Sequence, residues 1–130
     1  MKILMIFAAG FGTRMKHLTE DTPKPLVKVN GKPILYYNLD AAIKHGFEHI
    51  IINSHYKADQ IKTAVEDYIS THPDCPKITL LYEDPILETG GAIKNALSLI
   101  DSNHITTINS DVIIHSNQDF FARLESAWNP

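Results

Sequence analysis

The segment ILMIFAAGFGTR (residues 3–14) joins an apolar run to a glycine-rich loop. The apolar part, residues 3–7, has the length and composition of a buried strand. Glycines directly after such a strand allow a sharp turn and a close approach to a ligand, and successive backbone N–H groups in the turn can bind phosphate oxygens. Arg14 adds a planar cation that suits phosphate, and Lys24 follows between two prolines. The segment therefore predicts a polyphosphate site.

The two standard nucleotide motifs do not describe this loop. A dinucleotide fingerprint needs Gly-x-Gly-x-x-Gly at the start of a helix. Gly10 and Gly12 fit, but the third position is Met15, and prolines soon interrupt any helix. A P-loop needs Gly-x-x-x-x-Gly-Lys-Ser/Thr, which the loop lacks. Taken alone, the loop could also be a plain glycine turn that carries a solvated arginine.

Further motifs follow the loop in order. They are Leu18-Thr19, Thr22-Pro23-Lys24-Pro25-Leu26-Val27-Lys28-Val29, Gly31-Lys32-Pro33, Glu88-Thr89-Gly90-Gly91-Ala92 and Asn109-Ser110-Asp111. Together with the loop, they resemble the amino-terminal signature of the sugar-1-phosphate nucleotidyltransferases. The resemblance extends from about residue 2 to about residue 112. Residues 87–91 are most similar to N-acetylmuramate-1-phosphate uridylyltransferases and mannose-1-phosphate guanylyltransferases, and His17 stands where the family often has proline.

The resemblance implies an enzyme that transfers a nucleoside monophosphate from a nucleoside triphosphate, with UTP favoured, to a sugar-1-phosphate. An NDP-sugar and pyrophosphate are the products. Because two anions must meet, the barrier is largely electrostatic and positional, so the site needs cations, backbone donors and Mg²⁺ rather than a covalent nucleophile. The family's chains are nearly twice as long. Their later half holds much of the sugar-phosphate pocket and a second metal carboxylate, a position that Asp119 does not match.

The resemblance also implies roles for individual residues. The expected nucleotide-binding set is Ala8, Ala9, Gly10, Gly12, Thr13, Arg14, Glu83 and Gly90. Within it, Glu83 could accept a hydrogen bond from the nucleobase. Arg14 and Lys24 are the expected catalytic residues, and Lys24 and Asn109 are expected to bind substrate. Asp111 is the expected ligand of Mg²⁺, which proteins commonly hold by one or two carboxylates together with substrate phosphates and water.

Each of these residues also has a plainer interpretation. Arg14 could form a surface salt bridge of little energetic value, and Lys24 could be a solvated loop residue. Asp111 could close a strand through an Asx-turn. Glu83 could be a solvated loop acid, and Gly90 could simply open a helix. The sequence leaves these alternatives open.

The remaining chain alternates strand and helix patterns. Strands are expected over residues 3–7, 47–53, 78–82 and 105–108, and helices are expected to begin near residues 33, 58, 91 and 117. This alternation predicts an α/β fold with a three-layer, Rossmann-like, mostly parallel sheet flanked by helices. We expect one domain over residues 1–130, which the resemblance implies is the truncated nucleotide-binding half of a nucleotide-diphospho-sugar transferase fold. Such sheets bind ligands at the carboxyl ends of their strands, where every motif lies.

Composition and charge limit the partners. The chain has 130 residues, of which 44% are hydrophobic and 21% charged, as is usual for a soluble globular protein. The net charge of −3 argues against a nucleic-acid partner, which usually requires a basic patch. No apolar stretch approaches the ~20 residues that cross a bilayer, so no membrane partner is expected. The single cysteine, Cys75, and the lack of a signal-peptide pattern favour the cytoplasm.

Three functions remain open at this point. The chain could come from a complete nucleotidyltransferase, it could be a catalytically incomplete nucleotide-binding fragment or partner subunit, or it could be an unrelated dinucleotide-binding domain. The missing third glycine counts against the last, as does Asn53, which stands where such a domain would carry an acid. The seven histidines show no metal-binding spacing and are expected at the surface. None of these motifs encodes the sugar or the oligomeric state.

Overall fold

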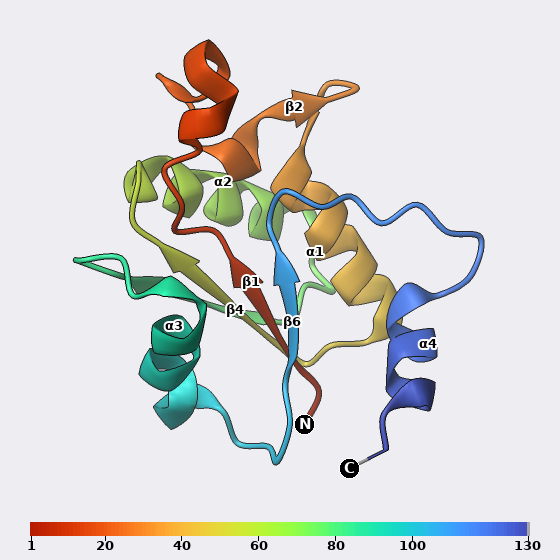
Figure 1. Cartoon of the computed structure of the whole chain (residues 1–130). Coiled ribbons are helices and arrows are strands. Elements are labelled where there is room, and N and C mark those ends of the chain that lie inside the picture. Colours follow the sequence, from red (N-terminus) through yellow and green to blue (C-terminus); the bar gives the residue numbers. More distant parts are fainter. Residues whose placement is uncertain (130) are drawn as a thin grey trace.

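A four-stranded parallel sheet forms the centre of the molecule. The computed structural model describes residues 1–129, and its strands lie in the order β5-β4-β1-β6 (Figure 1). They are β1 (Ile3–Phe7), β4 (His49–Ser54), β5 (Lys77–Tyr82) and β6 (Thr106–Asn109). The chain runs outward from β1 to β5 and then returns to place β6 on the other side of β1. The strand order therefore reverses between β1 and β6.

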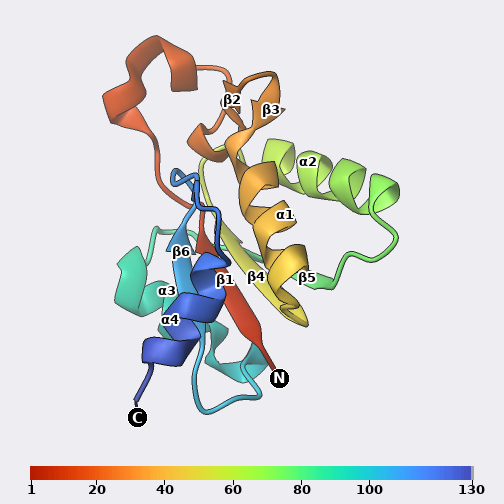
Figure 2. The ribbon, with the colours of Figure 1, turned by 90° about the vertical axis from the view of Figure 1, so that its right-hand side faces the viewer.

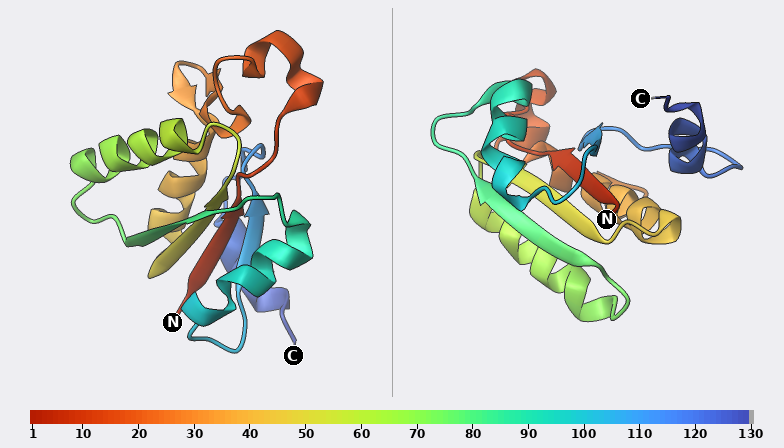
Figure 3. Two further views of the ribbon diagram at one scale, coloured as in Figure 1. Left: turned by 90° about the vertical axis from the view of Figure 1, so that its left-hand side faces the viewer. Right: turned by 90° about the horizontal axis from the view of Figure 1, so that it is seen from below.

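Helices cover both faces of this sheet (Figure 2). The helices α1 (Ile34–His45) and α2 (Ala58–Thr71) lie on one face, and α3 (Glu88–Ala96) lies on the other (Figure 3). A last helix, α4 (Phe120–Ala127), contributes Phe121 to the core on the α1 side. The predicted three-layer α/β architecture is confirmed. Within residues 1–129, every helix is too short or too polar to pass through a lipid bilayer.

The alternating side chains of β1 explain why the sheet carries helices on both faces. Leu4 and Ile6 belong to the larger core cluster, which includes α1 and α2, whereas Ile3 and Met5 pack with α3. All four side chains are 2% exposed or less. The neighbouring strand β4 is buried along its whole length, as expected for the apolar, β-branched run of a central parallel strand.

Two helices begin at positions that differ from the prediction. Helix α3 begins at Glu88 rather than after Gly91, so the paired glycines lie in its first turn and do not precede it. Helix α4 begins at Phe120 rather than near residue 117 because Asp119 caps it. The carboxylate of Asp119 accepts a hydrogen bond from the backbone N–H of Ala122, which satisfies a donor that the first helical turn leaves free.

The segment between β1 and α1 contains short elements that the sequence patterns did not reveal. They are two 3-10 helices, Thr13–Thr19 and Lys24–Leu26, and a small antiparallel hairpin of β2 (Lys28–Val29) and β3 (Lys32–Pro33). Each is too short for a hydrophobic period to appear. These elements matter for the site because they carry the basic residues of the amino-terminal motifs.

Two histidines contradict the expectation that all seven lie at the surface. His49, the first residue of β4, is 5% exposed, and its Nε2 atom lies 2.9 Å from the Thr79 hydroxyl. The side chain of His45 is 4% exposed and lies between carboxylates of Asp119 and Glu125, at 2.9 and 3.0 Å. Both residues are covered by chain segments that are distant in sequence, so their local spacing carried no sign of burial.

Candidate functional site

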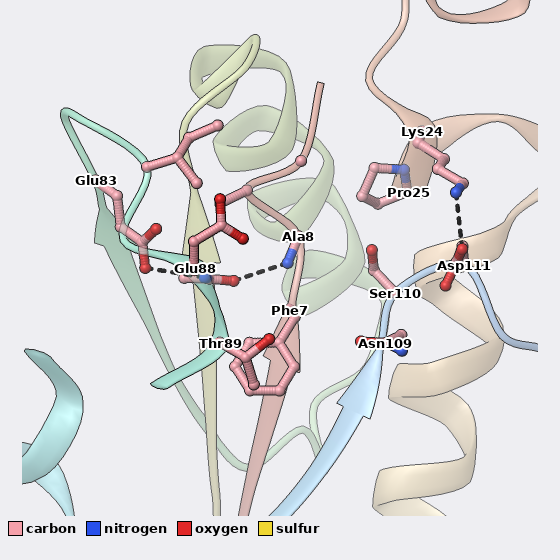
Figure 4. A pocket seen from close by; sticks show the side chains of 14 residues that line it. Phe7, Ala8, Lys24, Pro25, Glu83, Glu88, Thr89, Asn109, Ser110 and Asp111 are labelled. Carbon is pink, nitrogen blue, oxygen red and sulfur yellow. Dashed lines mark hydrogen bonds and ion pairs between the residues drawn. The ribbon is translucent and has the colours of Figure 1, made fainter. Parts of the chain in front are cut away.

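A cavity of about 250 Å³ opens at the carboxyl ends of the strands. Its wall is formed by residues 7–10, by Lys24 and Pro25, by the loop that follows β5 and by residues 109–111 (Figure 4). Parallel pairing brings these segments together, since Phe7 is the register partner of both Asn53 and Asn109. The cavity lies where the strand order reverses, which is the usual ligand position in open α/β sheets.

Two glycines shape the loop after β1 in different ways. Gly12 has a φ of 65°, and a Cβ atom there would lie 2.9 Å from Thr19 Cγ2 and 3.2 Å from Lys24 Cβ. The Thr19 hydroxyl also donates a hydrogen bond of 2.7 Å to the Gly12 carbonyl. Gly12 therefore lets the loop fold back closely onto the segment that carries Lys24. Around Gly10, by contrast, nothing lies within 4 Å of such a Cβ position, and its backbone lines the cavity.

An ion pair bridges the mouth of the cavity. The Nζ atom of Lys24 lies 2.7 Å from Oδ2 of Asp111, with side chains that are 31% and 36% exposed. Lys24 begins a short 3-10 helix and is flanked by the buried Pro23 and Pro25. Asp111 follows Ser110, whose backbone N–H donates to a carbonyl of β1 at 3.1 Å. Both partners therefore project from anchored backbone.

Behind the cavity, a chain of hydrogen bonds joins two loops, and we call it the buried relay (Ala8, Asn53, Glu83 and Leu87). The Ala8 N–H donates to Asn53 Oδ1 at 2.7 Å, and Asn53 Nδ2 donates to Glu83 Oε1 at 2.9 Å. The Leu87 N–H donates to Glu83 Oε2 at 3.2 Å. Asn53 is 3% exposed and Glu83 is 2% exposed. The interpretation of Glu83 as a solvated loop acid is therefore wrong.

Comparison with known proteins assigns this arrangement to a family. The sequence model of the family described as Nucleotidyl transferase matches residues 3–128. The chain belongs to the nucleotidyl transferase family. N-acetylmuramate alpha-1-phosphate uridylyltransferase of Caulobacter vibrioides is 37% identical over 131 residues, which cover 99% of this chain and 54% of that protein. Mannose-1-phosphate guanylyltransferase catalytic subunit beta of Xenopus tropicalis is 32% identical over 111 residues, covering 84% of this chain and 30% of that protein.

Solved structures agree with this membership. The structure of HddC from Yersinia pseudotuberculosis complexed with GMP-PN has a TM-score of 0.75 and 34% sequence identity, over 98% of this chain and 54% of that one. The resemblance that the sequence motifs indicated is confirmed. The chain spans about half the length of the uridylyltransferase and of HddC.

Most of the residues expected in a nucleotidyl transferase site line the cavity. They are Ala8, Ala9, Gly10, Lys24, Glu83, Asn109 and Asp111. Four others lie outside its wall: Gly12, Thr13, Arg14 and Gly90. Arg14 is exposed and forms no ion pair within residues 1–129, so its interpretation as a surface salt bridge is wrong. Direct nucleotide contacts by these four residues stay predictions.

Several cavity residues were not part of the expected set. Asn53, Ser110, Glu88 and Thr89 all line the wall. A signal for Asn53 was present in the sequence, since it is the first polar residue after the run Ile50-Ile51-Ile52 and therefore marks the carboxyl end of a buried strand. The other three sit inside family motifs, but nothing in their spacing distinguished cavity residues from their neighbours.

Asp111 is well placed for a metal that a phosphate ligand also binds. Within residues 1–129, no three His, Cys, Asp or Glu side chains are grouped so that they could hold a metal ion by themselves. Mg²⁺, however, commonly takes one or two carboxylates and completes its shell with substrate phosphates and water. The exposed carboxylate of Asp111, at the mouth of a cavity, fits that mode of binding.

Proposed function

We propose that this chain is the nucleotide-binding part of a Mg²⁺-dependent sugar-1-phosphate nucleotidyltransferase. The observation that carries the proposal is the cavity at the carboxyl end of the sheet. Residues 8–10, Lys24 and Asp111 all line this one cavity. Membership of the nucleotidyl transferase family over residues 3–128 supports the reaction class.

The nucleotide would bind along the loop after β1. The backbone of Ala8, Ala9 and Gly10 would contact the nucleobase and ribose, and residues 12–14 would surround the triphosphate. Arg14 supports this assignment because its exposed guanidinium is not engaged by an acid within residues 1–129. The loop after β5, with Glu83 behind it, would enclose the other side of the base together with Gly90 in the first turn of α3.

In the transfer, a phosphate oxygen of the sugar-1-phosphate forms a bond to the α-phosphorus. The bond from the α-phosphorus to the oxygen that bridges to the β-phosphorus breaks, and pyrophosphate leaves with the electron pair. Lys24 lies at the cavity mouth, where it would neutralise the phosphates of both substrates, and Arg14 would stabilise the leaving pyrophosphate. Asn109, at the end of β6, would donate a hydrogen bond to a sugar hydroxyl or accept one from it.

Asp111 would hold Mg²⁺ together with the substrate phosphates. When bound, such an ion neutralises phosphate oxygens and favours their alignment for displacement. Lys24 contacts the Oδ2 atom of the same carboxylate, so the cation of the cavity wall would stand beside the metal ion. Both would act on the same phosphate group.

UTP is the proposed nucleotide, and N-acetylmuramate-1-phosphate is the first sugar to test. The 37% identity to a uridylyltransferase supports uracil. Guanine is the nearest competitor, because a guanylyltransferase subunit is 32% identical and HddC was solved with GMP-PN. A competition titration with UTP, GTP, CTP and ATP separates these bases.

Pyrophosphate release tests the activity directly. The full chain would be incubated with Mg²⁺, each triphosphate and a panel of sugar-1-phosphates. Release with one pair confirms the transferase, whereas triphosphate binding without release supports the alternative, a catalytically incomplete nucleotide-binding fragment or partner subunit. That alternative is favoured by the chain's span of about half the length of its relatives. Absence of any triphosphate binding would contradict both.

A further inference from the structure

We infer that Asn53 and Glu83 are positioning residues that set the spacing between the two loops around the nucleotide. The inference deepens the proposed function and rests on it. Its basis is the buried relay, which connects the first residue of one loop, Ala8, to Leu87 at the entrance of the other. Ala8 directly follows β1, Asn53 lies near the end of β4, and Glu83 and Leu87 lie in the loop after β5.

The strand register delivers the relay side chains to one place. Asn53 is the register partner of Phe7, and Tyr82 is the partner of Ser54, so residues 8, 53 and 83 meet at the carboxyl ends of the strands. The backbone of Glu83 is fixed as well, because its N–H donates to the Ser54 carbonyl at 2.8 Å. The sheet therefore anchors the backbone of Glu83, and the Glu83 side chain in turn holds the Leu87 N–H.

Asn53 has the chemistry that this position requires. A side-chain amide carries one acceptor and two donors, and here the acceptor faces an N–H while a donor faces a carboxylate. An acid at the same position would face Glu83 with like charge, and an apolar side chain would leave the Ala8 N–H without its partner. The amide is what allows one side chain to hold both neighbours.

The carboxylate of Glu83 is costly for folding alone. It is 2% exposed, and within residues 1–129 its hydrogen-bond donors, the Asn53 amide and the Leu87 N–H, are neutral and it forms no ion pair. A buried charge costs free energy even when it is hydrogen-bonded, and an apolar side chain of similar size often serves stability as well or better. Its hydrogen bonds do, however, fix the relative orientation of two segments.

Both of those segments line the cavity. Ala9 and Gly10 follow Ala8 in one segment, and Glu88 and Thr89 follow Leu87 in the other. A change in the relay would alter the gap between them, where a planar base would lie. The cations Lys24 and Arg14 are outside the relay, so attraction of phosphate should change less than discrimination between bases.

Two substitutions separate the links of the relay. Glu83→Gln leaves one acceptor oxygen for two donors, so the Leu87 amide should exchange its hydrogen about tenfold faster or more. Asn53→Asp places two carboxyl groups together, so both the Ala8 and Leu87 amides should exchange faster at neutral pH.

Thr79→Val is the matched control. It removes the hydrogen bond between Thr79 and the buried His49. Both residues lie in β4 and β5, in the amino-terminal halves of these strands and therefore away from the relay. We expect this control to lose some stability while both relay amides exchange as in the wild type and the ratio of UTP to GTP affinity stays unchanged. In Asn53→Asp and Glu83→Gln, that ratio should move at least about threefold toward unity, a change well within the energy of one hydrogen bond.

The measurements are amide exchange by NMR on the ligand-free full chain and titration with UTP, GTP, CTP and ATP. If Asn53→Asp leaves the Leu87 amide as slow as in the wild type, or if both variants keep the wild-type affinity ratios, the positioning role is wrong. The same holds if Thr79→Val shifts the ratios equally, since that reveals a general effect of stability. A wild-type chain that binds no triphosphate refutes the proposed function instead, while the exchange data still decide whether the loops are coupled.

Discussion

The Nζ atom of Lys24 lies 2.7 Å from Oδ2 of Asp111 across the mouth of the cavity. Each side chain is about one third exposed, so water screens the pair and its contribution to folding stability should be below about 1 kcal/mol. The two residues lie on well-anchored segments, however, and their charges face the same space. Substitutions of the pair should therefore separate ligand binding from stability.

Asp111→Asn should abolish the effect of Mg²⁺ on triphosphate affinity. The amide keeps the shape of the side chain but lacks the negative charge that a hard cation requires. The free energy of unfolding should change by less than about 1 kcal/mol, because the lost ion pair is exposed. Titrations of UTP with and without Mg²⁺, together with urea denaturation, measure both quantities.

Asp101→Asn is the control for that change, because Asp101 is exposed and lies outside the cavity wall. It should keep the full response to Mg²⁺. An unchanged Mg²⁺ response in Asp111→Asn itself would contradict the assignment of the metal ligand.

Gly12→Ala should weaken both folding and triphosphate binding. The left-handed backbone costs a residue with a Cβ atom roughly 1–2 kcal/mol, and the new methyl group would meet Thr19 and Lys24 at 2.9 and 3.2 Å. Gly10→Ala meets no atom within 4 Å, so its stability should stay within about 0.5 kcal/mol of wild type. Its methyl group would nevertheless narrow the wall on which the nucleotide lies, and affinity should fall. Thermal unfolding and titration compare the two variants, and a Gly12→Ala chain as stable as wild type would refute this account of the loop.

Arg14→Ala should reduce triphosphate affinity at least about tenfold, as expected for loss of a charge-assisted hydrogen bond to phosphate. Stability should hardly change, because the side chain is exposed. Affinity for the nucleoside without phosphates should stay as it is. The exposed Arg123 on α4 serves as control, and Arg123→Ala should leave all affinities unchanged. Equal losses in both variants would show only a general effect of net charge.

His45 should make the folded state less stable as the pH rises. Burial alone would lower the pKa of its imidazole, but hydrogen bonds and charges from Glu125 and Asp119 outweigh burial and raise the pKa of His45. The folded chain thus binds this proton more tightly than the unfolded chain. The stabilisation is complete below the unfolded pKa of about 6.5 and is lost as the pH rises through the higher folded value. His45→Gln should remove this decline from denaturation curves recorded between pH 5 and 9. If the decline persists in the variant, another titrating group causes it.

His49 should act in the opposite direction. Burial, and secondly the charge of Lys77, lower the pKa of His49, so the unfolded chain binds the proton more readily. Stability is present above the unfolded pKa of about 6.5 and is lost as the pH falls toward the lower folded value. His49→Gln should therefore reduce the loss of unfolding free energy that denaturation curves show as the pH falls below about 6.5. The decline at higher pH, which depends on His45, should stay as in wild type. A variant with an unaltered acid side would show that this imidazole does not limit stability.

Sequence motifs predicted the fold and the position of the site because both depend on local order. The run Ile3–Phe7 identifies β1, and every parallel strand delivers its following loop to the same edge of the sheet. Asn109 and Asp111, which end and follow β6, could be assigned to the cavity for that reason, whereas Lys24 was assigned by resemblance. Thr13, Arg14 and Gly90 were also assigned by resemblance, and they lie outside the cavity wall.

Side-chain contacts between distant segments were beyond the sequence. Ala8 and Asn53 are 45 residues apart, and Asn53 and Glu83 are 30 apart. Whether these residues meet depends on the register of three strands. A shift of one residue in that register would turn the side chains of a strand to the other face of the sheet. The burial of His45 beside α4 has the same origin, since its partner Asp119, which caps that helix, lies 74 residues later in the chain.

The charges around the cavity have a consequence for how a ligand would arrive. Glu83, Glu88 and Asp111 line it, and Lys24 is the only lysine or arginine among the described residues that does. A bare polyanion approaching from solvent would meet more negative charge than positive charge and be repelled. A nucleotide that already carries a divalent counterion meets a much smaller barrier. For the proposed nucleotide, this charge balance would favour entry of the neutralised complex, so that nucleotide and metal would arrive in a single step.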